Sequence, residues 1–125
     1  MNKTPAFING DGNQTRDFTF VENAVQINIK GMLSTNDAAK NKVYNVAVGE
    51  NYSVNHLYNA IKEYLKSNIE AVHRESREGD IRNSLADISL AKNLLAYEPT
   101  TKFDGGLIKT IDFFKELYSS KPFQF

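Results

Sequence analysis

The stretch from Arg74 to Lys92 carries the residues of this chain that are best suited to binding an anionic ligand. Three arginines gather around Gly79, just before an apolar helical pattern resumes. The guanidinium of Arg77 presents paired donors that match phosphate oxygens. A carboxylate three residues later, Asp80, can accept both hydroxyls of a ribose, and glycine lets the backbone turn between them. The same charges are also typical of a solvated loop, so the pattern alone leaves both interpretations open.

The remaining polar candidates give weaker signals. Arg16 lies on an alternating segment opposite Asp17, and a lone strand arginine is usually a solvated or salt-bridged edge residue. The turn at 9–12, NGDG, lacks the G-x-G-x-x-G spacing of a phosphate-binding loop. His56 and His73 have no second ligand at a helical spacing, so we expect no metal site.

Composition excludes several functional classes. The chain has 125 residues, which fits one domain, and its 15 basic and 15 acidic residues cancel. We therefore expect neither a nucleic-acid nor a membrane partner, and any anion site must be local. The absence of cysteine excludes disulfides and thiolate chemistry. The opening residues do not resemble a signal peptide, so the simplest expectation is a cytoplasmic protein.

Strands and helices alternate in the predicted secondary structure. Apolar or alternating segments predict strands at 6–8, 15–21, 42–49 and 70–74. On the alternating segment after the NGDG turn, Phe18 and Phe20 should share one face. Apolar spacings of three and four predict four helices, beginning near Glu22, after an N-cap at Ser53, after a cap at Asp87, and before Leu107.

Each predicted helix has an apolar stripe that we expect to face the core. The stripes are Val25, Ile29, Met32 and Leu33; Val54, Leu57, Ile61 and Leu65; Ile88, Ala91, Leu94 and Leu95; and Leu107, Ile111, Phe114 and Tyr118. The fold class is therefore α/β, with about four helices and few short strands. These strands are too few to complete a sheet, which favours one partial domain over 1–125 with a frayed tail at 119–125.

Three segments occur in an order that resembles a known family. They are INGDGNQTRDFTFVENAVQINI, VYNVAVGENYSVNHLYNAI and REGDIRNSLADISLAKNLLAYEP. This order is similar to that of extended short-chain dehydrogenases/reductases that modify nucleotide sugars, above all the UDP-N-acetylglucosamine 4-epimerases and UDP-glucose 4-epimerases. The resemblance runs from about Phe7 to Phe114 and covers the carboxy-terminal, substrate-binding part of such enzymes.

The resemblance implies roles for five residues. Arg16 and Arg77 match arginines that grip the substrate diphosphate, and Asp80 matches the acid that contacts the uridine ribose. Phe18 matches a position, often tyrosine, that lines the nucleotide site. Ser84 matches the position that governs sugar bulk, where a small residue favours N-acetylated substrates. For Arg74 and Arg82 the resemblance implies nothing, and we expect them on a solvated surface.

The resemblance also implies parts that this chain should lack. The family has an amino-terminal Rossmann half, which binds NAD through a glycine-rich loop and carries a catalytic Tyr-x-x-x-Lys pair. We predict no such loop or pair here, hence no catalytic residue, no cofactor bound to this chain alone and no epimerase activity. UDP-sugar is the expected ligand, and self-association or a Rossmann half the expected partner.

Two alternatives stay open at this stage. One is a free-standing module that binds UDP-sugars, and the other is a piece of a related nucleotide-sugar dehydratase or decarboxylase.

Overall fold

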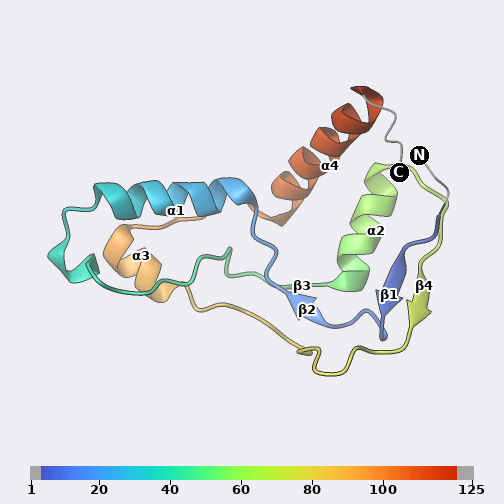
Figure 1. Ribbon diagram of the computed structural model, residues 1–125, viewed down its shortest axis with the longest axis horizontal. Helices are drawn as coiled ribbons and strands as arrows, with labels where there is room; N and C mark the ends of the chain where they lie inside the picture. The colour runs from blue at the N-terminus through green and yellow to red at the C-terminus, as the bar shows by residue number, and fades with distance from the viewer. Residues whose placement is uncertain (1–3, 121–125) are drawn as a thin grey trace.

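The computed structural model describes residues 4–120 and shows an α/β protein with four α-helices and a few short strands (Figure 1). In chain order the elements are β1 (Phe7–Asn9), β2 (Thr15–Arg16), α1 (Val21–Leu33), a 3-10 helix η1 (Asp37–Ala39), β3 (Tyr52–Ser53), α2 (Val54–Tyr64), β4 (Val72–Arg74), α3 (Ser89–Leu95) and α4 (Phe103–Ser120). The predicted fold class is confirmed. None of the helices described is long and apolar enough to cross a membrane.

The strands form two separate pairs. β1 and β4 run parallel, with Phe7 opposite Val72 and Asn9 opposite Arg74. β2 and β3 are antiparallel, with Thr15 opposite Ser53. The strands predicted at 6–8 and 70–74 are confirmed to within a residue or two. Both pairs lie at the same end of the molecule, beside α2 (Figure 1).

Two strand predictions need correction. The segment 42–49 contains no strand, although it is rich in β-branched residues, and Val43 is 91% exposed. A strand is stable only when a neighbour accepts its hydrogen bonds, and no strand among residues 4–120 pairs with this segment. The predicted strand 15–21 shrinks to two residues because β3, its partner, has only two. Phe18 and Phe20 nevertheless both lie against α4, as their shared face predicted.

One hydrophobic core lies between α1, α3 and η1. Its buried members are Ile27, Ala39, Ala47, Ile88, Ala91, Leu95 and Tyr97. The Tyr97 hydroxyl is satisfied by the Ala47 carbonyl oxygen at 2.9 Å, so the ring is buried without an unpaired polar atom. The prediction of a helix after Asp87 with its apolar side chains inward is confirmed. Asp87 accepts a hydrogen bond from the Ser89 amide at 2.8 Å.

The predicted core face of α1 is wrong. Val25, Ile29, Met32 and Leu33 are 52%, 50%, 84% and 73% exposed. The buried side chains of α1 are Asn23 and Ile27, on the side that meets α3 and the segment before α4. The apolar pattern did not reveal the buried face of α1. The more apolar face is exposed, because no element among the described residues covers it (Figure 1).

α2 and α4 form the second packed unit. Ser53 caps α2 as predicted, accepting from the His56 amide at 3.0 Å. On α4, Ile111 is buried but Phe114 and Tyr118 are 46% and 49% exposed, which corrects the predicted stripe. α4 has 18 residues and α2 has 11, so the last turns of α4 extend beyond α2 (Figure 1). α4 runs to Ser120, and 121–125 of the predicted frayed tail lie outside the described residues.

Candidate functional site

The loop between β4 and α3 is fastened along β2 by backbone hydrogen bonds. The Thr15 amide donates to the Arg82 carbonyl oxygen at 2.9 Å, and the Ser84 amide donates to the Thr15 carbonyl oxygen at 3.1 Å. Thr15 and Asn83 also form a parallel bridge. This pairing brings residues 80–84 beside Arg16, although more than sixty positions separate them in the sequence.

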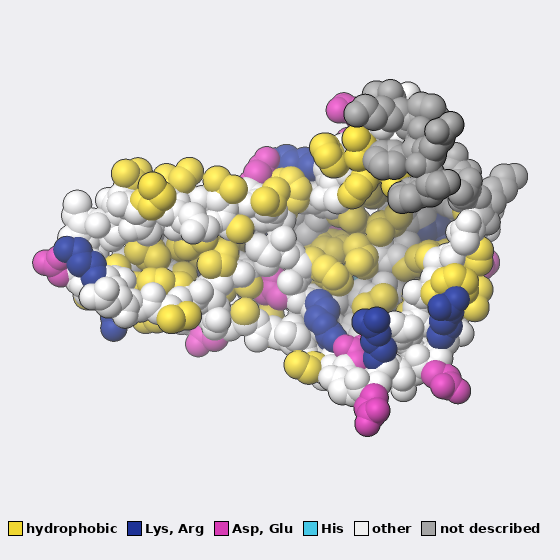
Figure 2. Space-filling view, viewed as in Figure 1, with side chains coloured by type: hydrophobic (Ala, Val, Ile, Leu, Met, Phe, Trp, Pro, Cys, Tyr) yellow, Lys and Arg dark blue, Asp and Glu magenta, His cyan; other side chains and the backbone are white. Residues whose placement is uncertain are grey.

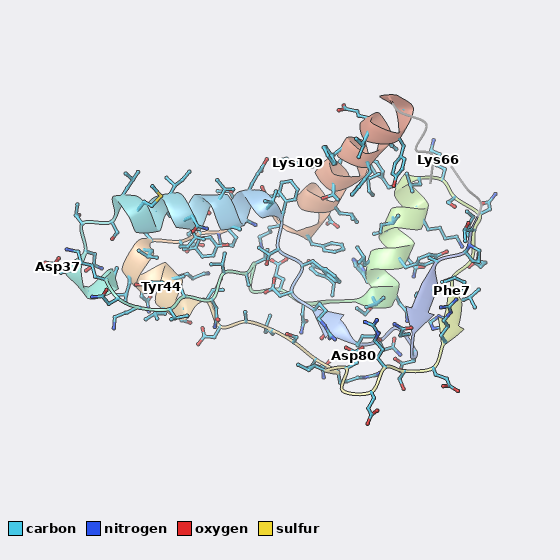
Figure 3. The ribbon with its side chains drawn as sticks, viewed as in Figure 1. Phe7, Asp37, Tyr44, Lys66, Asp80 and Lys109 are labelled. Carbon is cyan, nitrogen blue, oxygen red and sulfur yellow. The ribbon has the colours of Figure 1, made fainter. Side chains whose placement is uncertain are left out.

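Arg16 and Asp80 meet in a direct ion pair, Nη2 to the carboxylate. Their side chains are 31% and 32% exposed, so the pair lies at the surface but is partly shielded from water. Nη1 of Arg16 donates to the carbonyl oxygens of Thr15 and Ile81 at 2.7 and 2.6 Å. Figure 3 shows Asp80 on the loop close to β2. Arg16 is therefore a fixed cation, not a freely solvated edge residue.

Arg77 lines a polar cavity of about 400 Å³ together with Asp80 and Arg82. Basic and acidic side chains gather on this part of the surface (Figure 2). A tight turn shapes the cavity wall, in which the Asp80 amide donates to the Arg77 carbonyl oxygen at 3.2 Å. Gly79 has φ 77°, and a Cβ there would meet no other atom. Glycine is therefore required at this position by backbone conformation and not by lack of space.

Arg82 is exposed, as predicted, and it also forms a two-pronged ion pair with Asp11 of the NGDG turn. Its Nη1 and Nη2 donate to the two carboxylate oxygens at 2.7 and 2.8 Å. These bonds, followed by one from the Asn13 amide, hold the pKa of Asp11 far below its usual range. Asn55 of α2 closes the turn from the other side, and its Oδ1 lies where a Cβ on Gly12 would clash at 2.0 Å.

Arg74 also has a specific contact. Its guanidinium carbon lies 3.3 Å from the centre of the Phe7 ring, across the β1–β4 pair. The loop arginines therefore differ in their contacts. Arg74 and Arg82 contact other side chains of the fold, whereas the Arg77 guanidinium has no hydrogen-bond or ion-pair partner among residues 4–120.

Phe18 lies in a different cavity from Arg77. Its half-buried ring packs 5.7 Å from the ring of Phe103, and Phe103 stacks on Tyr52 at 4.3 Å. Phe18 and Phe103 help to line an apolar cavity of about 320 Å³, together with Leu57. The structure therefore brings Arg16, Asp80 and the backbone of Ser84 together and places Arg77 in the same polar cavity as Asp80, whereas Phe18 lines a separate cavity. The Ser84 side chain is exposed.

Asp17 is a site-supporting residue that the sequence pattern did not single out. Its carboxylate accepts hydrogen bonds from the amides of Val48 and Gly49 at 3.0 and 2.8 Å. Asp17 thereby fixes the chain between Arg16 and Phe18 onto the segment before β3. The sequence did contain one indication of this role: on an alternating strand, Asp17 points to the opposite side from Arg16.

The prediction that this chain contains no Tyr-x-x-x-Lys pair was wrong. Tyr58 and Lys62 do stand four residues apart on α2, as in Tyr-x-x-x-Lys. Their contacts are elsewhere, however: the Tyr58 hydroxyl donates to the Ile69 carbonyl oxygen, and Lys62 pairs with Glu70. Both residues tie α2 to the segment before β4, and neither contacts the Arg16–Asp80 pair.

The histidines have structural contacts. His56 stacks on Tyr52 at 5.0 Å between ring centres, and His73 Nδ1 lies 2.8 Å from the Gly10 carbonyl oxygen. Among residues 4–120 no cluster of acidic or histidine side chains could hold a metal ion.

Solved structures with a similar fold include nucleotide-sugar epimerases. A UDP-glucuronic acid 4-epimerase from Bacillus cereus, in complex with UDP-glucuronic acid and NAD, matches with a TM-score of 0.85 at 28% identity, over 93% of this chain and 37% of that one. A UDP-N-acetylglucosamine 4-epimerase from Methanobrevibacter ruminantium, in complex with UDP-N-acetylmuramic acid, gives 0.81 at 35% identity, over 90% and 35%. The fold is that of the substrate-binding part of an extended short-chain dehydrogenase/reductase.

The sequence comparisons agree and define the family. The chain belongs to the family described as GDP-mannose 4,6 dehydratase, whose model matches residues 1–110. A UDP-glucose 4-epimerase from Mycolicibacterium smegmatis is 31% identical over 108 residues, 86% of this chain and 34% of that protein. Other relatives are UDP-sugar decarboxylases. The chain spans about a third of the length of the curated relatives it matches.

Proposed function

We propose that this chain forms the UDP-sugar-binding part of an NAD-dependent nucleotide-sugar 4-epimerase that interconverts UDP-N-acetylglucosamine and UDP-N-acetylgalactosamine. One observation carries the proposal. The Arg16–Asp80 pair lies at the edge of a polar cavity lined by Asp80 and Arg77, and all three side chains come from segments fastened by the backbone bonds of Thr15. A fixed Arg16–Asp80 pair with a second guanidinium beside the same cavity suits a diphosphate linked to a ribose.

In this proposal the two arginines bind the diphosphate from different positions. Arg16 is held rigidly by backbone carbonyl oxygens, so it costs little conformational entropy to engage a ligand. Arg77 is exposed and can close over the second phosphate from the cavity wall. Asp80, between them, accepts hydrogen bonds from the ribose hydroxyls.

Phe18 and Ser84 serve the two ends of the ligand. Phe18 contributes an aromatic surface from the apolar cavity that it lines, which suits the planar base. Ser84 has its backbone fixed to Thr15 and a small exposed side chain, which leaves room for an N-acetyl group on the sugar.

The chemistry of the whole enzyme divides between this chain and the rest of the protein. Bound NAD supplies hydride acceptance and return at the sugar C4. These 125 residues contain no G-x-G-x-x-G sequence, so we assign no NAD contact to them. What this chain provides is positioning: anchoring the UDP group at a distance from C4 holds the diphosphate while the sugar turns. The chain alone should therefore show no epimerase activity.

Calorimetric titration of UDP-N-acetylglucosamine into this chain tests the binding role. We expect heat of binding that is lost in Arg16→Ala and in Arg77→Ala, with circular dichroism spectra unchanged. Equal affinity in both variants and the parent chain would refute the diphosphate roles.

The same titration addresses a second candidate, a free-standing UDP-sugar-binding module. The observation in its favour is that the Arg16–Asp80 site is assembled entirely from residues of this chain. A folded chain that releases no heat with UDP-N-acetylglucosamine would exclude the module and leave a site that needs the remainder of the enzyme.

The related decarboxylases motivate a product assay on the complete enzyme. Conversion of UDP-N-acetylglucosamine to UDP-N-acetylgalactosamine is the expected result, whereas release of carbon dioxide from a UDP-glycuronic acid would identify a decarboxylase instead.

A further inference from the structure

We infer that Asp80 exchanges partners on ligand binding: it neutralises Arg16 in the free protein and moves to the ribose when a diphosphate takes its place. This exchange makes the site selective for diphosphates that carry a ribose over a diphosphate alone. The inference rests on the proposed function and assigns to Asp80 a specificity-determining role through its contact with Arg16.

The orientation of Arg16 does not depend on Asp80. Nη1 donates to two backbone carbonyl oxygens, those of Thr15 and Ile81, at 2.7 and 2.6 Å. Both carbonyls belong to segments locked together by the backbone bonds of Thr15 with Arg82 and Ser84. Because a guanidinium is planar, two fixed contacts on one nitrogen determine the direction of the whole group. Asp80 can leave without releasing the arginine.

The remaining donors of Arg16 are those that a phosphate would use. Both Nη1 hydrogens are occupied by the carbonyl oxygens, Nη2 contacts Asp80, and Nε has no acceptor among residues 4–120. A phosphate that binds in a two-pronged manner needs Nε and Nη2 together. The Asp80 carboxylate then stands beside the incoming phosphate, and two like charges at contact distance repel. Binding of the anion therefore favours departure of the carboxylate from Nη2.

The Asp80 carboxylate can also occupy a second position, in the polar cavity that it helps to line. Asp80 also lines the polar cavity with Arg77, and its backbone belongs to the turn closed by the Asp80 amide and the Arg77 carbonyl oxygen. Its side chain is 32% exposed, so rotation toward the cavity meets little packing. In the cavity, a ribose offers two hydroxyl donors to the released carboxylate. Pyrophosphate offers none, so it must break the ion pair without compensation.

The test compares inorganic pyrophosphate and UDP as ligands of this chain by calorimetric titration. Asp80→Asn removes the competing charge, and Glu78→Gln is the matched control, since it removes the same charge from the same turn without touching Arg16. We expect Asp80→Asn to raise pyrophosphate affinity about fivefold, the upper size of an exposed ion pair, and Glu78→Gln less than about twofold. UDP affinity should rise less or fall, so that the ratio of UDP to pyrophosphate affinity decreases.

Three outcomes overturn the inference. Asp80→Asn leaves the pyrophosphate affinity unchanged or lowers it, Glu78→Gln raises the pyrophosphate affinity by the same factor as Asp80→Asn, or no variant binds pyrophosphate. Asp80→Ser repeats the measurement with a second neutral side chain, and circular dichroism verifies folding. If UDP binding requires Arg16 and Arg77 but Asp80→Asn gives no pyrophosphate gain, only the exchange fails. If UDP binding is indifferent to both arginines, the proposed function fails as well.

Discussion

At the scale of single residues, chemically identical side chains have different tasks according to what they contact. Arg82 is committed to Asp11, Arg74 to the Phe7 ring and Arg16 to two carbonyl oxygens and Asp80. Arg77 has no such commitment among the described residues and borders a polar cavity. A guanidinium that is not engaged within the protein keeps its donors for a ligand, so Arg77 is the residue whose loss should affect binding with least effect on folding.

Replacing Arg77 by alanine should weaken UDP-sugar binding without loss of stability. Loss of a charge-assisted hydrogen bond predicts a roughly tenfold to hundredfold rise in the KM of the complete enzyme, or in the Kd of this chain. Lys42→Ala is the control, because it removes one exposed positive charge from the segment between Asp37 and Tyr44. Figure 3 shows Asp37 and Tyr44 at the opposite end of the molecule from Asp80. If both substitutions raise the KM or Kd equally, Arg77 contributes only to the overall charge of the chain and does not contact the ligand.

Replacing Ser84 by tyrosine tests the specificity argument. The Ser84 amide is bonded to Thr15, so the substitution enlarges the side chain at a fixed backbone position. Turnover of the N-acetylated sugar nucleotide should fall about tenfold more than turnover of the plain hexose, because only the larger substrate loses its space. Ser84→Ala, which adds no bulk, should preserve the ratio of the two activities. An equal fall for both substrates in Ser84→Tyr contradicts the assignment.

At the scale of elements, a few polar side chains fasten segments that hydrophobic contact alone would not align. Asn23 of α1 is fully buried and bonds both the amide and the carbonyl oxygen of Thr101, at 3.1 and 2.6 Å. Asp17 fastens the end of β2 to the segment before β3 in a similar manner. These contacts set the positions of the cavities more directly than the short strands do.

Asn23→Ala should destabilise the fold by about 2 kcal/mol, since it leaves two buried backbone groups of Thr101 unpaired. Urea unfolding followed by circular dichroism measures the effect. Asn28→Ala on the same helix is the control, because Asn28 is exposed and bonds only the Ala24 carbonyl oxygen of its own helix. A loss of stability no greater than that of the control would show that the Thr101 groups find other partners.

The Asp11–Arg82 pair predicts a pH dependence of stability. Arg82 lowers the pKa of Asp11 in the folded chain, so the unfolded chain binds a proton at higher pH than the folded one. The stabilisation is complete above about pH 5 and is lost as pH falls through the unfolded pKa near 4 toward the lower folded value. The urea midpoint of the parent chain should therefore fall more steeply with acidification than that of Asp11→Asn. Parallel pH profiles would contradict this linkage.

At the scale of the whole molecule, apolar side chains remain on the outside of α1. Val21, Val25, Ile29, Met32 and Leu33 are all at least half exposed, and Val43 of the unpaired segment 42–49 is 91% exposed. Figure 2 shows hydrophobic side chains along the edge of the molecule formed by α1. A continuous apolar face of this kind marks a contact surface. We propose that a second copy of this chain covers it when the chain is alone in solution.

Covering of this face predicts self-association of the chain when it is alone in solution. Sedimentation velocity should show a concentration-dependent shift to larger species, which Ile29→Lys reduces. Asn28→Lys is the matched control, since it adds the same side chain at the adjacent exposed position and leaves the apolar residues intact. The proposal that α1 is the contact face is wrong if the chain is monomeric at all concentrations, or if Ile29→Lys and Asn28→Lys change self-association equally.

Local sequence patterns determined the helices and the turns. Apolar spacing located four helices, Ser53 marked the start of α2, and the turn chemistry of NGDG separated β1 from β2. Collinear motifs also identified the family and selected Arg16, Arg77 and Asp80 before any contact was known. The helices and turns depend on residues close together in the chain, so a sequence specifies them directly.

Only the tertiary structure decided which faces are buried and how the site is held. The strand predicted at 42–49 failed because pairing requires a neighbour, and no described segment supplies one. The exposure of the apolar face of α1, and of Phe114 and Tyr118 on α4, has the same cause. A side chain is buried only where another element packs opposite it. The ion pairs of Arg16 with Asp80 and of Arg82 with Asp11 join residues more than sixty positions apart. Such contacts arise from the path of the whole chain, which no local pattern encodes.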